Sequence, residues 1–103
     1  MNIHQSFIGG QWVGTRATIP IINPSDGQVI AEISRGGKAE IDRAIAAAEA
    51  AMEGNWGRMD QAVRGRLLLK MSELIKRDTE LLAKIESEDV GKPLSQARAD
   101  VAA

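Results

Sequence analysis

The sequence of 103 residues contains no cysteine, which removes disulfides, thiolate metal ligands and a cysteine nucleophile from this stretch. Aromatic side chains are also scarce, at 3% of the residues: Phe7, Trp12 and Trp56. Because large rings supply much of the buried area of a small core, the core must come mainly from Leu, Ile, Val, Met and Ala. A core of that kind is thin for an independent domain of this size.

Long apolar runs and a strong charge of one sign are missing too. No window approaches the roughly 18 apolar residues that span a bilayer, and the start of the chain lacks the features of a secretory signal. The formal net charge is −1, from 13 basic and 14 acidic residues, which gives no electrostatic reason to expect a nucleic acid or an anionic membrane as partner. We therefore expect a cytoplasmic protein with neither kind of partner.

The first third of the chain has the pattern of short strands joined by turns. Gly9-Gly10 separates two apolar runs, and both glycines can adopt the positive φ of a tight hairpin turn. Pro20 lies in the next apolar run and cannot donate to a sheet, so we expect that strand at a sheet edge. Residues 23–27 predict a turn that Gly27 closes in the left-handed region, and residues 28–34 predict a further strand.

The remaining two thirds predict helices. From 39 to 52, apolar side chains recur at intervals of three and four residues, which places them on one helix face. The glycines around Trp56 predict a loop, and Asp60 is suited to the N-cap of the next helix. Gly91 and Pro93 predict the end of that helix, and Pro93 also suits the start of another.

Residues 61–90 carry the clearest helical pattern and predict one rod of roughly 45 Å. One hairpin and one short helix offer too little surface to cover such a rod, so we expect the chain to be a fragment of a larger protein. The apolar side chains on one side of this helix are called the stripe: Leu67, Leu68, Met71, Leu74, Ile75, Leu81, Leu82 and Ile85.

Familiar phosphate-binding chemistry is excluded by spacing. The segment from Gly91 to Pro93 lacks both the upstream glycine and the Ser or Thr that a phosphate loop needs around its Gly-Lys pair. The carboxylates of Glu86, Glu88 and Asp89 fit either a cation site or merely the acidic flank of a long helix.

Taken together, the segments resemble the opening of the aldehyde dehydrogenase superfamily in their order and spacing over nearly the whole chain. The matching segments are residues 7–13 (FIGGQWV), 23–31 (NPSDGQVIA), 41–48 (IDRAIAAA), Trp56, 64–68 (RGRLL), 74–75 (LI), 86–94 (ESEDVGKPL), 97–98 (AR) and 100–101 (DV).

The resemblance implies an α/β fold, in which the chain supplies the N-terminal hairpin, strands and covering helices of a Rossmann-like cofactor domain. Residues 1–103 would be the N-terminal part of that domain, with the hairpin and strands in 1–37 and the helices in 38–103. The catalytic and oligomerisation domains would lie outside this chain.

The implied activity is the oxidation of an aldehyde to a carboxylic acid with NAD or NADP, by an enzyme that is a homodimer or homotetramer when complete. In the family, a cysteine thiolate attacks the aldehyde and a glutamate activates the water that hydrolyses the thioester. Both residues, and those that hold the cofactor, are expected beyond Ala103. The chain therefore has no catalytic or cofactor-binding candidate of its own, and we expect it to be inactive when isolated.

One functional element of the family falls within the chain. Many members hold a structural monovalent cation between a backbone carbonyl just before the Asn-Pro turn and an acidic residue three positions before the lysine of Gly-Lys-Pro. The corresponding metal ligands here are Ile21 or Ile22, through the backbone, with Ile22 preferred, and Asp89.

A second hypothesis comes from another class of protein. The chain could be a non-catalytic helical interaction module that exposes the stripe between Leu67 and Ile85 and binds a partner as a helix in a groove. The particular aldehyde and the choice between NAD and NADP are not encoded in these residues.

Overall fold

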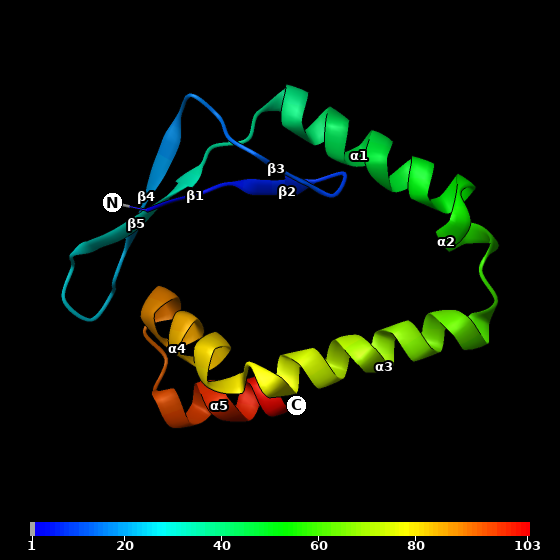
Figure 1. Cartoon of the computed structure of the whole chain (residues 1–103). Helices are drawn as coiled ribbons and strands as arrows, with labels where there is room; N and C mark the ends of the chain where they lie inside the picture. The colour runs from blue at the N-terminus through cyan, green and yellow to red at the C-terminus, as the bar shows by residue number, and fades with distance from the viewer. Residues whose placement is uncertain (1) are drawn as a thin grey trace. The chain divides into compact units, whose positions relative to one another are not determined.

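The computed structural model describes residues 2–103, which form five short strands and five helices (Figure 1). They divide into two compact units. The first unit contains the residues up to Ile21 together with Val29–Met59, and the second contains Ile22–Gln28 and Asp60–Ala103. Helices dominate, and the strands lie in the first third of the chain. This mixture is consistent with an α/β fold.

The first unit begins with the predicted hairpin, which is confirmed. Strands β2 (Ser6–Ile8) and β3 (Gln11–Val13) pair antiparallel, with Phe7 opposite Trp12. Gly9 and Gly10 both have positive φ, 60° and 79°, which is the conformation that a two-residue turn of this kind requires. The two rings lie 5.0 Å apart between centroids and are both largely exposed.

A separate three-stranded sheet has the order β1-β5-β4. Strand β1 (Ile3–His4) pairs in parallel with β5 (Val29–Ser34), placing Ile3 beside Glu32. Strand β4 (Thr18–Ile22) lies at the sheet edge, as Pro20 predicted.

Helix α1 (Lys38–Glu53) follows β5 and packs against the hairpin, where Gly9 lies near the side chain of Ala47. The loop predicted around Trp56 was wrong, because these residues form a short helix, α2 (Asn55–Arg58). The physical reason is a tight corner that glycine permits. A Cβ built on Gly57 would lie 1.6 Å from the carbonyl oxygen of Met52, so the backbone of α2 can fold back on the end of α1 only without a side chain there.

The second unit shows that the single long rod predicted for residues 61–90 was also wrong. Two helices stand in its place, α3 (Gln61–Arg77) and α4 (Thr79–Val90), separated by Asp78 at φ −99° and ψ 23°. At this point the side chain of Thr79 competes with the helical backbone for a carbonyl, and Asp78 is held by a pair of side-chain hydrogen bonds. Thr79 Oγ1 donates to the carbonyl of Lys76 at 2.6 Å, and the carboxylate of Asp78 accepts from the guanidinium of Arg77 at 2.9 and 3.0 Å. Asp60 occupies the N-cap position of α3, as expected, but its side chain makes no capping hydrogen bond.

Helices α4 and α5 (Leu94–Ala102) pack against each other, α4 ending at Gly91 with the left-handed φ of 77° that its sequence predicted (Figure 1). Pro93 is the N-cap of α5, which confirms its expected role. Ala83 of α4 and Ala97 of α5 are both fully buried, at 0% exposure. Their small side chains allow the two helix axes to approach closely.

Most of the stripe on α3 and α4 is not covered by the rest of the described chain, although Ile75 and Leu82 are half-buried. Leu68 is 59% exposed, and only three apolar side chains in residues 2–103 are classed as buried: Ala31, Ala83 and Ala97. The large side chains therefore remain at the surface, while small ones form what core there is.

Candidate functional site

The turn before β5 is held by its own polar groups. The backbone N–H groups of Ser25 and Gln28 donate to the carboxamide of Asn23 and the carboxylate of Asp26, each at 2.9 Å. Gly27 adopts φ 74° and its N–H donates to the carbonyl of Asn23 at 2.8 Å. The turn is thus fixed by local chemistry, and its shape does not depend on a ligand.

This turn belongs to the same unit as the end of α4, and the two approach closely. A Cβ built on Gly91 would lie 2.9 Å from Cγ of Pro24. Ile22, the last residue of β4, precedes the turn, and Asp89 lies in the last turn of α4, two residues before Gly91. Both candidate ligands therefore lie in one compact unit, each within two residues of this contact.

The charge pattern at the end of α4 is unusual for a helix. The last turn carries Glu88 and Asp89 and no basic residue, although a helix C-terminus already has a partial negative charge. Glu88 lies 3.9 Å from the ammonium of Lys84, whereas Asp89 is exposed. Among residues 2–103, no group of three or more His, Asp or Glu side chains gathers in a way that could hold a metal ion.

Lys92 lies beside this region and forms ion pairs that the sequence did not predict. The Lys92 ammonium pairs with the carboxylates of Asp100 and Glu86, the latter at 3.5 Å, and thereby links the end of α4 to α5. The hydrogen bond with Asp100 raises the pKa of Lys92. The hydroxyl of Ser87 donates to the Lys92 carbonyl at 2.7 Å and holds the same segment in place. No helical spacing connects Lys92 with a partner eight residues away, so the pattern gave no signal for this pair.

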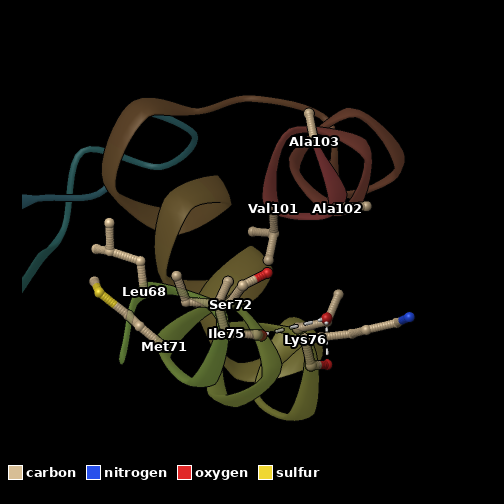
Figure 2. Close-up of a pocket in the computed structure, with 9 residues that line it drawn as sticks. Leu68, Met71, Ser72, Ile75, Lys76, Val101, Ala102 and Ala103 are labelled. Carbon is tan, nitrogen blue, oxygen red and sulfur yellow. Dashed lines mark hydrogen bonds between the residues drawn. The ribbon is translucent and has the colours of Figure 1, made fainter. Parts of the chain in front are cut away.

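A shallow hollow of about 520 Å³ lies between α3 and the end of α5 (Figure 2). Figure 2 shows Val101 of α5 pointing toward Ser72 of α3. Aliphatic side chains make up most of the lining, including Leu68, Met71 and Ile75 from the stripe, and the polar side chains that line it are Ser72, Lys76 and Thr79. We also find no helix in residues 2–103 that is long and apolar enough to cross a membrane.

Comparison with known proteins decides the family. The family model described as "Aldehyde dehydrogenase family" matches residues 12–103. This covers most of the chain. The chain belongs to the aldehyde dehydrogenase family.

Two relatives and one solved structure illustrate how close this aldehyde dehydrogenase segment is to known members. It is 43% identical over 94 residues to the mitochondrial aldehyde dehydrogenase of Rattus norvegicus, covering 87% of this chain and 18% of that protein. It is 42% identical over 98 residues to the betaine aldehyde dehydrogenase of Bacillus subtilis, covering 92% and 20%. The crystal structure of an NAD-dependent aldehyde dehydrogenase from Sinorhizobium meliloti superposes with a TM-score of 0.92 at 35% identity, covering 98% of this chain and 21% of that one.

The chain therefore spans about a fifth of the length of the aldehyde dehydrogenases that it matches. The resemblance seen in the sequence is confirmed for the family and for the α/β class of the fold. The comparisons concern the segment as a whole and single out neither Ile22 nor Asp89.

Among the described residues, helix α1 follows directly after a strand, and a carboxylate already caps its start. Dinucleotide-binding folds place the pyrophosphate on free N–H groups at a helix N-terminus that follows a strand. In this aldehyde dehydrogenase segment the corresponding place is Gly37, between β5 and α1, and its N–H already donates to the Glu40 carboxylate at 2.8 Å. That hydrogen bond lowers the pKa of Glu40, so the group is anionic at neutral pH and repels a phosphate. At the start of α1, one backbone donor is therefore already occupied and a carboxylate lies beside it.

Proposed function

We propose that residues 1–103 form the N-terminal part of the cofactor-binding domain of an enzyme that oxidises an aldehyde to a carboxylic acid with NAD or NADP. The observation that carries this proposal is the match of 98% of the chain to 21% of a solved NAD-dependent relative, with a TM-score of 0.92. The cysteine, the glutamate and the cofactor-binding residues would come from sequence outside this chain, as would the contacts of a homodimer or homotetramer. A cytoplasmic location is part of the same proposal.

In this proposal the segment acts as a scaffold. Its eight stripe residues would each contribute about 1.5–3 kcal/mol if fully buried, or on the order of 10–20 kcal/mol together. A whole domain is stable by only about 5–15 kcal/mol. The free energy gained by burying the stripe is therefore as large as the stability of a whole domain. We propose that the remainder of the cofactor domain covers the stripe.

The test is an assay on the protein encoded by the complete reading frame. We expect this protein to reduce NAD or NADP in the presence of an aldehyde, followed as absorbance of the reduced cofactor. The 103-residue chain is the matched control, and we expect calorimetric titration to show no saturable cofactor binding to it. An inactive complete protein, or saturable NAD binding by the short chain, would contradict the proposal.

The segment's own proposed site is a structural monovalent cation bound by the backbone carbonyl of Ile22 and the carboxylate of Asp89. Its support is the contact between Pro24 and Gly91, which brings the two chain segments together, and the negative potential at the end of α4. Carbonyl and carboxylate oxygens are suitable ligands for hard cations.

To test the cation site, urea unfolding of the complete protein is measured in KCl and in N-methylglucamine chloride at equal ionic strength. We expect potassium to raise the unfolding midpoint, Asp89→Asn to remove that difference, and Glu88→Gln to retain it. A wild-type midpoint that is the same in both salts would refute the site without affecting the proposed enzymatic activity.

The rival function, a helical interaction module, is favoured by one observation: the exposed stripe of α3 and α4. The two proposals differ in how the 103-residue chain behaves alone. As part of an enzyme it should associate or remain a helical molten state, without a cooperative transition in near-UV circular dichroism at Trp12 and Trp56. A monomer with a sharp transition, together with a stop codon directly after Ala103, would favour the interaction module.

A further inference from the structure

No further inference is drawn: the strongest candidate, the aliphatic hollow between α3 and the end of α5 lined by Leu68, Met71 and Val101, is an unpartnered apolar face, and nothing in the structure shows what covers it.

Discussion

Two parts of the second unit use apolar side chains in opposite ways. Where α4 packs on α5, the residues with no exposed surface are alanines, Ala83 and Ala97, and ion pairs such as Glu80 with Arg98 flank the contact. On α3, by contrast, Leu68 and Leu69 are 59% and 67% exposed. Strong helical amphipathicity thus does not identify the buried residues of this segment. In this unit the helices pack closely where the side chains are small, and the large side chains of α3 remain exposed.

The largest effect that would test this contrast is expected at the stripe. Leu68→Ala should lower the free energy of unfolding of the complete enzyme by about 2–5 kcal/mol, because the side chain would be buried there. In the isolated 103-residue chain the same change should leave the helical circular dichroism signal unaltered. The measurements are urea unfolding of the enzyme and far-UV circular dichroism of the chain.

Leu69→Ala is the matched control, since Leu69 lies off the stripe on the same helix and is 67% exposed. We expect it to change the stability of the enzyme by less than about 0.5 kcal/mol. If the two substitutions lower the free energy of unfolding equally, or if neither lowers it, the stripe is not buried in the complete enzyme.

The next effect concerns the close contact of α4 and α5. Ala97→Leu should cost about 1–3 kcal/mol, because Ala97 is fully buried and a larger side chain must push the helices apart. Ala99→Leu adds the same groups on the exposed side of α5 and should be nearly neutral. Urea unfolding of the complete protein carrying either substitution measures the difference. Equal free energies of unfolding would mean that the packing of α4 on α5 leaves room for a larger side chain.

A smaller effect is expected at the end of α4. Gly91→Ala should cost about 1–2 kcal/mol, because the residue has φ 77° and the new Cβ would approach Pro24. Gly65→Ala in α3 should have the opposite sign, a gain of about 0.5–1 kcal/mol, since a Cβ there meets nothing within 4 Å. If both substitutions shift the urea midpoint in the same direction, the positive φ of Gly91 does not explain the difference expected between the two glycines.

The smallest effect is expected from Lys92→Met, which removes exposed ion pairs that water and salt screen. Because the folded-state pKa of Lys92 is raised by Asp100, its contribution is fully present below the pKa of the unfolded chain and is lost as the pH rises through the folded-state pKa. The difference in unfolding midpoint between wild type and variant should therefore be constant from pH 7 to 9 and shrink above about pH 10.4. Lys70→Met, at an exposed lysine of α3, should show no such trend. A difference that grows at alkaline pH would contradict the assigned pairing.

Features set by local steric rules were predictable from the sequence. The hairpin followed from Gly9-Gly10, the edge strand from Pro20, and the end of α4 from Gly91, because each depends on which φ values or hydrogen bonds one residue allows. The break at Asp78 was missed, since the apolar period continues through it and the hydrogen bond from the Thr79 hydroxyl to the Lys76 carbonyl leaves that period unchanged.

The candidate site was less accessible to sequence reasoning than the fold. A backbone carbonyl ligand has no side-chain signature, so Ile22 could be named only through the family resemblance. Asp89 is one of several carboxylates near the end of α4, and periodicity does not separate it from Glu86 or Glu88. The approach of Pro24 to Gly91 joins segments more than sixty residues apart and required the structure.

The parallel pairing of β1 with β5 also sets an order of events during synthesis. Ile3 pairs with Glu32, so β1 must wait for about 29 further residues, or roughly 1.5–6 s at typical elongation rates. The β2–β3 hairpin lies entirely inside that interval and a hairpin forms in about 1–10 μs. It can therefore form long before β5 leaves the ribosome, and once formed it shortens the loop that the β1–β5 pair must close.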